Sequence, residues 1–224
     1  MDLLDKISLR DSDVLYVLGD VLDRGPHPIK TLRELMKMPN AVCIIGNHEL
    51  MALESLQFMM QEVTLDSIKK LDAQMLDEFL VWAEHNGGRT TIDEFRLLNR
   101  DEQNEIIEFL KDFSVYEEID VAGKNYLLIH AGLGGYSPEK DIEDYSLKEL
   151  VWDRADYDIM YYPDRYVVTG HTPTQYIKGN PNPGFIYRCN NHIAIDCGAH
   201  IPGGRLAAIC LDTGEEFYSA HTSE

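Results

Sequence analysis

The sequence is short of positive charge, cysteine and long apolar stretches, and each shortage excludes a class of protein. Twenty Lys and Arg residues stand against 39 Asp and Glu residues, a net charge of -19. This argues against a nucleic-acid backbone or a membrane as a partner. The four cysteines have no CxxC spacing, so we expect reduced thiols. No apolar run approaches the roughly 18 residues of a membrane span, and no signal peptide opens the chain, so we expect a cytoplasmic protein.

The apolar residues that are present predict an α/β fold. A chain of 224 residues that is 44% hydrophobic can bury one large core, so we expect a single domain over residues 1–224. Helical patterns cover residues 1–9 and 28–38, and the tail from residue 193 to 218 is typical of antiparallel strands and a hairpin. Alternation of strands and helices implies parallel strands covered by helices. Short apolar runs predict strands at residues 14–18, 41–45, 126–129 and 166–169.

The region from residue 50 to about 115 has helical patterning only, and we expect a helical cap inserted between two strands. Asn86-Gly87-Gly88 is expected to end one of its helices. Thr91 followed by Glu94 predicts a capping box that opens the next helix. The apolar positions that keep a helical period are Leu65, Ile68, Leu71, Leu76, Phe79 and Leu80.

Four polar segments follow the predicted strands. Because α/β sheets place their sites at the carboxyl ends of strands, we expect these segments to form one site. Each segment alone could have a purely structural role, as a turn or as a histidine that is hydrogen-bonded in the core. Four such segments in this order are improbable by chance. The segments are Gly19 to Gly25 (Gly-Asp-Val-Leu-Asp-Arg-Gly), Gly46-Asn47-His48-Glu49, His130-Ala131-Gly132 and Gly170-His171-Thr172.

These segments supply the ligand types that a transition-metal ion takes while it holds phosphate. Asp20 offers a carboxylate that can bridge two cations. Asn47 offers an amide oxygen, and His130 and His171 offer imidazole nitrogens. The four residues are therefore the expected metal ligands.

Three further residues complete the expected chemistry. His48 directly follows Asn47 and so points elsewhere, which leaves it free to donate a proton to the leaving oxygen. Asp23 would orient His48 and stabilise its charged form. Arg24 can contact phosphate oxygens in a bidentate manner.

At these four motifs the chain resembles the phosphoprotein phosphatase family within the calcineurin-like metallophosphoesterases, in particular its bacterial branch, which also holds diadenosine tetraphosphatase-like enzymes. The resemblance implies a sandwich of two mixed sheets flanked by helices, with a helical cap insertion. It also implies the ligand set and the His48–Asp23 acid pair given above, and manganese as the expected ion, with iron or zinc as alternatives. Val151 to Arg154 resembles the segment that supplies a second phosphate-binding arginine, here Arg154; a surface salt bridge is the alternative.

One family motif is missing. The first metal of the family takes an Asp and a His from an opening Gly-Asp-x-His-Gly, and no Asp-x-His occurs in this sequence. A strand beside residues 14–18 would be lost with it. We weigh an N-terminally truncated copy of a longer protein against a naturally short, crippled enzyme, and favour truncation. A complete member holds two ions; here we expect one, and compromised activity.

The resemblance leaves three functions open. The leading one is hydrolysis of phosphate esters by a metal-bound hydroxide, as in a serine/threonine protein phosphatase. The alternatives are a dinucleoside polyphosphate hydrolase and a one-metal pseudo-phosphatase that binds a phosphorylated partner. The expected partner is a phosphorylated protein or a small phosphoester substrate. Few basic residues lie around the motifs, which favours phosphopeptides over a dinucleoside polyphosphate. The basic residues around the motifs are Arg24, Arg154, Arg89 and Arg205. The sequence leaves the oligomeric state open.

Overall fold

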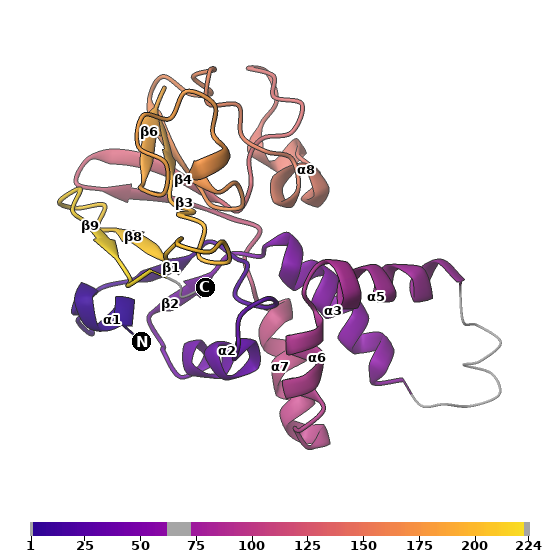
Figure 1. The fold of residues 1–224 in the computed structure, drawn as a ribbon. Coiled ribbons are helices and arrows are strands. Elements are labelled where there is room, and N and C mark those ends of the chain that lie inside the picture. Colours follow the sequence, from indigo (N-terminus) through magenta and orange to yellow (C-terminus); the bar gives the residue numbers. More distant parts are fainter. Residues whose placement is uncertain (1, 62–72, 222–224) are drawn as a thin grey trace. The chain divides into compact units, whose positions relative to one another are not determined.

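The computed structural model describes residues 2–61 and 73–221 and has the expected α/β fold of mixed sheets and helices (Figure 1). The chain divides into two compact units. Unit 1 consists of residues 1–19, 42–46 and 114–224, and unit 2 of residues 20–41 and 47–113. Within the described ranges, no helix combines the length and the apolar character needed to cross a membrane.

Unit 1 contains a five-stranded mixed sheet with the order β3-β4-β5-β7-β6. The three central strands run parallel, and β3 and β6 pair antiparallel at the two edges. Central strands are covered on both faces, which is why β4 and β5 end in near-continuous apolar runs. β3 was not predicted. The strands are β3 (Tyr116–Val121), β4 (Lys124–Ile129), β5 (Arg165–Thr169), β6 (Tyr187–Cys189) and β7 (His192–Ala194).

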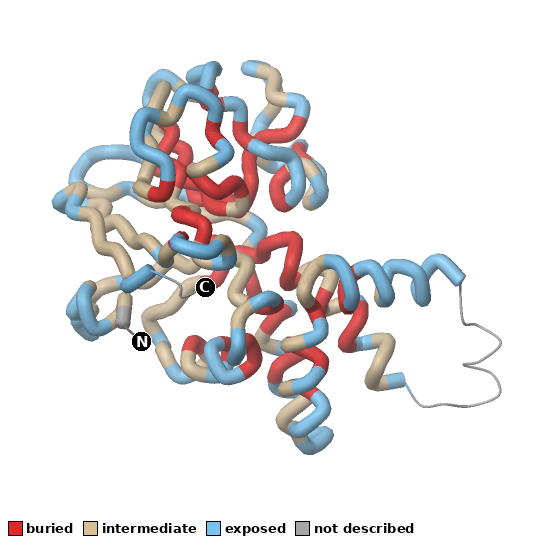
Figure 2. The backbone as a smooth tube through the Cα atoms, viewed as in Figure 1, coloured by how far each residue is buried: buried red, intermediate tan, exposed pale blue. Residues whose placement is uncertain are grey.

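Each face of this sheet carries its own hydrophobic cluster, and Figure 2 shows the buried residues along these strands. Leu127 and Val167 belong to the cluster that includes Leu150 of helix α8 (Leu147–Val151). Tyr126 and Val168 belong to the other cluster, against which residues of the smaller strands pack. Alternate residues of one strand therefore serve opposite faces, as the pleat requires.

The smaller strands form two pairs. β1 (Leu15–Val17) pairs with β2 (Ala41–Cys43), and β8 (Ala207–Ile209) pairs antiparallel with β9 (Glu216–Tyr218). The latter pair is the hairpin that the tail of the sequence predicted. The short helix α1 (Asp2–Ile7) contacts both of its strands, and Lys6 Nζ donates to the carbonyl of Tyr218 at 3.0 Å.

In the described part of unit 2 the regular structure is helical, except for Ala41 at the start of β2, in agreement with the sequence pattern. Helix α5 ends at His85, and Gly87 takes a positive φ of 88°, so the predicted glycine stop is confirmed. The predicted positions Leu65, Ile68 and Leu71 lie outside the described residues. The helices among the described residues of this unit are α2 (Pro28–Met36), α3 (Asn47–Met59), α5 (Ala73–His85), α6 (Arg89–Phe95) and α7 (Arg100–Lys111).

The predicted capping box at Thr91 and Glu94 is wrong. Helix α6 begins at Arg89, so Thr91 lies inside it, and the N-cap residue is Gly88. Both side chains act on distant segments instead: Thr91 contacts Asp23, and Glu94 accepts the backbone N–H of Ile29 at 2.9 Å. The local sequence pattern therefore pointed to two residues that in fact stabilise contacts between segments distant in the sequence.

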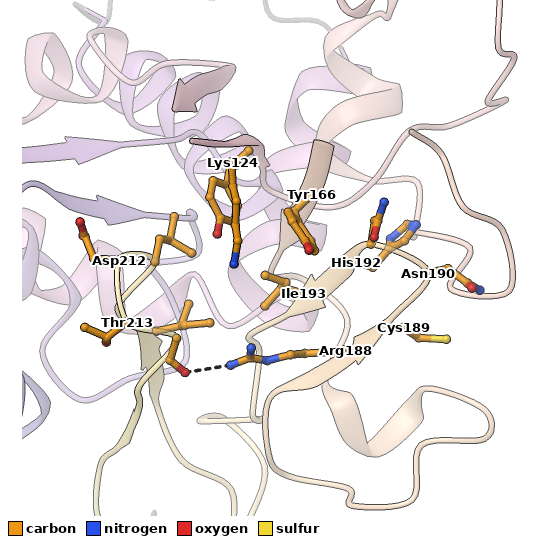
Figure 3. A pocket seen from close by; sticks show the side chains of 14 residues that line it. Lys124, Tyr166, Arg188, Cys189, Asn190, His192, Ile193, Asp212 and Thr213 are labelled. Carbon is orange, nitrogen blue, oxygen red and sulfur yellow. Dashed lines mark hydrogen bonds between the residues drawn. The ribbon is translucent and has the colours of Figure 1, made fainter. Parts of the chain in front are cut away.

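A cavity of about 440 Å³ opens on unit 1 beside the starts of β4 and β5 (Figure 3). Lys124, Tyr166 and Arg188 line it together with the turn of the β8–β9 hairpin. Arg188 is already engaged, because its Nη2 atom bonds to Glu216 at 2.7 Å. None of the residues that the sequence predicts for the site lines this cavity. The predicted residues of unit 1 follow the opposite ends of the same strands.

Candidate active site

Two histidines of unit 1 meet because β4 and β5 are parallel neighbours. His130 directly follows β4, and His171 follows β5 by two residues. The Gly170 N–H donates to the carbonyl of His130 at 2.9 Å, which continues the strand pairing past the strand ends. The Nε2 atom of His130 then lies 3.2 Å from Nδ1 of His171. The sheet register thus brings together two residues that are 41 positions apart.

The arrangement of these rings fits a shared metal ion. The Leu18 carbonyl can only accept, so His130 donates its Nδ1–H to it, at 2.6 Å, and Nε2 carries the lone pair. Two nitrogens about 2.0–2.1 Å from one ion, at roughly 90–110°, are separated by about 2.8–3.4 Å. The observed 3.2 Å lies in that range. His130 is fully buried, so solvent does not compete for its ring.

Unit 1 also holds the two glycines that precede the other predicted ligands. A Cβ atom on Gly19, whose φ is 80°, would lie 2.6 Å from the nitrogen of Gly46 and 2.7 Å from Nδ1 of His130. No side chain fits there, which explains glycine at this position. Asp20 and Asn47 are the next residues in the sequence.

In unit 2, Glu49 shapes the loop that carries Asp20. The Glu49 side chain is completely buried and accepts the backbone N–H groups of Asp20, Val21 and Leu22 at 2.7–3.0 Å. A carboxylate that accepts several backbone donors is a strong anchor. Sequence reasoning quoted Glu49 in its motif but assigned it no role.

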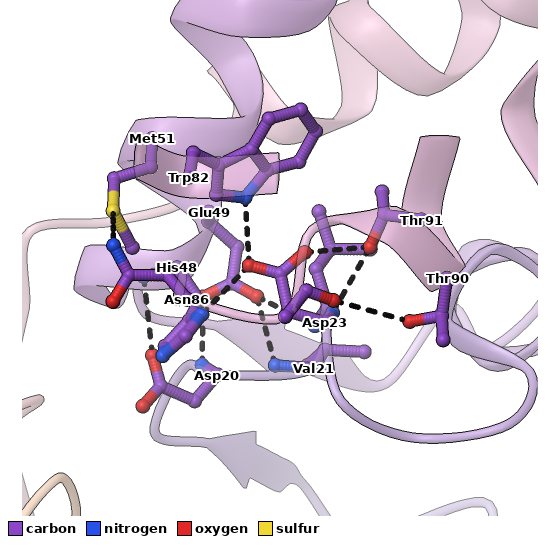
Figure 4. A network of polar contacts seen from close by, with 12 residues as sticks. Asp20, Val21, Asp23, His48, Glu49, Met51, Trp82, Asn86, Thr90 and Thr91 are labelled. Atoms are coloured by element: carbon purple, nitrogen blue, oxygen red, sulfur yellow. Dashed lines mark hydrogen bonds and ion pairs between the residues drawn. The ribbon is translucent and has the colours of Figure 1, made fainter. Parts of the chain in front are cut away.

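The predicted acid pair of unit 2 is formed and buried (Figure 4). His48 Nδ1 lies 2.7 Å from Oδ2 of Asp23, and the two side chains are 3% and 0% exposed. Burial by itself lowers the pKa of His48. The hydrogen bond to Asp23 and the charge of Asp20 outweigh it, so the pKa is raised above its ordinary value. The raised pKa suits a group that keeps a proton to donate.

Four of the predicted site residues have a strained backbone. Asp20, Asp23 and Arg24 of unit 2 and His171 of unit 1 all take positive φ, between 55° and 69°. Left-handed backbone costs residues other than glycine about 1–3 kcal/mol each, and it persists only where the surroundings enforce it. Strain of this kind is typical of functional loops.

The two predicted phosphate-binding arginines are both exposed. In unit 2, the backbone N–H of Arg24 donates to the Gly87 carbonyl at 3.1 Å. In unit 1, the residue after Arg154 packs so closely on the loop after His130 that a Cβ on Gly132 would lie 2.5 Å from the nitrogen of Ala155. Arg154 therefore lies next to the His130 loop.

The fold is α/β, the imidazole pair of His130 and His171 follows two parallel strands, and His48 and Asp23 form an acid pair. These are features of the metallophosphoesterase class of hydrolases. The chain belongs to the calcineurin-like phosphoesterase family, whose model matches residues 1–175. A crystal structure of a metallophosphoesterase from Sphaerobacter thermophilus is similar in fold, with a TM-score of 0.52 at 14% identity. That similarity covers 99% of this chain and 82% of the other.

Two relatives are named for dinucleoside tetraphosphates. The asymmetrical bis(5'-nucleosyl)-tetraphosphatase PrpE of Halalkalibacterium halodurans is 26% identical over 239 residues, which cover 93% of this chain and 83% of that protein. The symmetrical bis(5'-nucleosyl)-tetraphosphatase of Delftia acidovorans is 36% identical over 75 residues. This second match covers 33% of this chain and only 27% of the enzyme.

Proposed function

We propose that this chain is a metal-dependent hydrolase of dinucleoside polyphosphates. The observation that carries the proposal is the match with the asymmetrical tetraphosphatase, which runs over nearly the whole of both proteins. Both relatives described above are named for dinucleoside tetraphosphates. They favour the alternative of the sequence analysis over its leading choice, the serine/threonine protein phosphatase.

Asp20, Asn47, His130 and His171 are the proposed ligands of a divalent transition metal. The support from unit 1 is the 3.2 Å spacing of two ring nitrogens, one of which is fixed as an acceptor by a backbone carbonyl. When bound, such an ion polarises phosphate oxygens and activates water. Mixed oxygen and nitrogen donors suit manganese, iron or zinc, and manganese is our choice.

His48 is the proposed general acid. Its Nδ1–H is held by the Asp23 carboxylate, so Nε2 is the nitrogen that gives a proton to the leaving phosphate oxygen. The transferred proton neutralises the negative charge that develops on the leaving oxygen as its bond to phosphorus breaks. Asp23 stabilises the charged ring before the transfer and keeps its orientation.

The sequence has few basic residues near the motifs, which favoured a phosphopeptide as the substrate. Two of these residues, however, can still contact a polyphosphate chain. Within the described residues, Arg24 and Arg154 form no ion pair with a carboxylate, whereas Arg89 pairs with Glu84 at 3.3 Å. Arg205 lies over the ring of Phe185 at 4.4 Å. Arg24 and Arg154 are therefore the proposed contacts for a polyphosphate chain.

The test compares two substrates on one metal-loaded preparation. We would measure kcat/KM for diadenosine tetraphosphate and for a phosphothreonine peptide with manganese at fixed ionic strength. We expect the dinucleotide to be preferred at least tenfold. Chromatography of the products would also show whether cleavage gives two ADP or ATP and AMP.

A tenfold preference for the peptide would overturn the substrate choice and return the protein phosphatase to first place. Phosphoester binding without turnover, at full metal occupancy, would support the pseudo-phosphatase instead. The matched control is His192→Asn, because His192 is a buried histidine of unit 1 that binds the Ile159 carbonyl and has no proposed role. This variant should keep the wild-type preference.

A further inference from the structure

The Asp23 carboxylate receives more hydrogen bonds than its partnership with His48 requires. Besides His48, it contacts the indole nitrogen of Trp82, 2.8 Å from Oδ2, and the hydroxyl of Thr91, 2.6 Å from Oδ1. The Asp23 side chain is wholly buried, so no solvent shares these oxygens. Figure 4 shows both groups converging on the carboxylate.

The direction of each of these hydrogen bonds is fixed. An indole N–H can only donate. The Thr91 hydroxyl accepts the backbone N–H of Asp23 at 3.0 Å, so its own proton is directed to Oδ1 of Asp23. Both carboxylate oxygens therefore act as acceptors towards neutral donors. His48 must then supply its Nδ1–H, which leaves Nε2 as the atom that faces the reaction.

The helical region is built to seat these donors. Trp82 lies on α5 and Thr91 on α6, and they are 1% and 0% exposed. Gly88 is required between them, because a Cβ there would lie 2.5 Å from the Trp82 ring. Neither residue touches Asp23 through local sequence, since they are 59 and 68 positions away from it.

We propose that Trp82 and Thr91 are positioning residues that hold Asp23 as a pure acceptor and thereby fix the proton of His48 on Nδ1. This inference rests on the proposed function, in which His48 is the general acid. It gives helices α5 and α6, which carry these residues, a role in proton transfer as well as in packing.

A positioning role predicts a loss that depends on the leaving group. Trp82→Phe keeps an aromatic ring but removes the N–H donor, and Thr91→Val keeps the shape but removes the hydroxyl. Each should lower kcat for phenyl phosphate, whose basic leaving oxygen needs a proton, by about 10- to 100-fold. For 2,4-dinitrophenyl phosphate, whose leaving oxygen needs no proton, the loss should stay below about threefold.

Two matched controls lie on the same helix. Thr91→Ser retains the hydroxyl and should restore kcat on phenyl phosphate. Thr90→Val removes a neighbouring hydroxyl that bonds to the Gly87 carbonyl rather than to Asp23, and it should change neither ester. Equal losses on the two esters in Trp82→Phe and Thr91→Val would show that both residues only pack, and would overturn the proposal.

A second readout does not need turnover. In wild type, proton NMR should show a downfield, slowly exchanging Nδ1–H of His48, identified by its absence in His48→Asn. Trp82→Phe and Thr91→Val should speed its exchange at least tenfold, and an unchanged resonance in both would overturn the proposal. Failure of the dinucleotide preference, with the ester pattern intact, would reject only the substrate and leave this inference standing.

Discussion

Each unit holds a close contact between a histidine ring nitrogen and a second side chain, and the two contacts differ in the partner atom. His48 and Asp23 in unit 2 are a donor and an acceptor that satisfy each other at 2.7 Å. His130 and His171 in unit 1 bring two ring nitrogens to 3.2 Å, one of them fixed as an acceptor by the Leu18 carbonyl. The first arrangement holds a proton and the second suits a cation, so the partner atoms define the role of each histidine.

The two pairs are also built differently. The imidazole pair follows from the register of neighbouring parallel strands, with Leu128 opposite Val168. The acid pair depends on side chains from separate helices, among them Trp82 and Thr91. Substitutions should therefore separate metal binding from proton transfer.

The largest expected effect is the removal of a proposed ligand. His130→Asn should lose the bound metal and reduce hydrolysis to background, because the substitution removes the Nε2 atom, one of the four proposed ligand atoms. Asp20→Asn should do the same. Metal content after dialysis and kcat on 4-nitrophenyl phosphate would be measured together. If both variants keep wild-type metal and activity, neither residue is a ligand.

The next prediction is stoichiometric. With one proposed ligand set, the chain should retain about one transition ion after dialysis. Elemental analysis against protein concentration measures this ratio. Two tightly held ions would show that further residues act as ligands.

A smaller effect is expected from the loop anchor. Glu49→Gln should lower the free energy of unfolding by about 2–4 kcal/mol, because a buried charged acceptor for three backbone donors is lost. The matched control is Glu94→Gln, since Glu94 also accepts two backbone donors but its side chain is 25% exposed. Urea unfolding should give less than about 1 kcal/mol for the control. Equal losses would contradict the anchoring role of Glu49.

The smallest effect concerns strain. Arg24→Gly and Arg24→Ala remove the same guanidinium, but only glycine adopts a φ of 55° without cost. The free energy of unfolding of Arg24→Gly should therefore exceed that of Arg24→Ala by up to about 1 kcal/mol. The two variants should have the same activity as each other, because both lack the guanidinium. Greater stability of Arg24→Ala in urea unfolding would show that the loop relaxes when the arginine is absent.

The sequence predicted those features that depend on local pattern. Asp20, Asn47 and His130 each come soon after a short apolar run, so the strand ends and the polar residues behind them could be placed without a structure. The glycine stop after α5 is likewise a local signal. β3 was missed because its exposure only partly alternates and its sequence mixes apolar with acidic residues.

The features that the sequence did not predict depend on contacts between distant residues. Thr91 and Glu94 have the spacing of a capping box, yet their side chains bind Asp23 and the start of α2. Trp82 received no predicted role, because nothing in its sequence neighbourhood reveals a hydrogen bond to Asp23, 59 residues away. Glu49 anchors a loop 27–29 residues before it.

The most direct test of the account is the turnover of diadenosine tetraphosphate by wild type and His48→Asn at equal metal occupancy. The account predicts that the wild-type chain hydrolyses the dinucleotide and that His48→Asn is slower by about 10²–10⁴-fold with unchanged bound metal, because only the general acid is removed. Equal turnover by the two proteins, or no turnover by wild type, would contradict it.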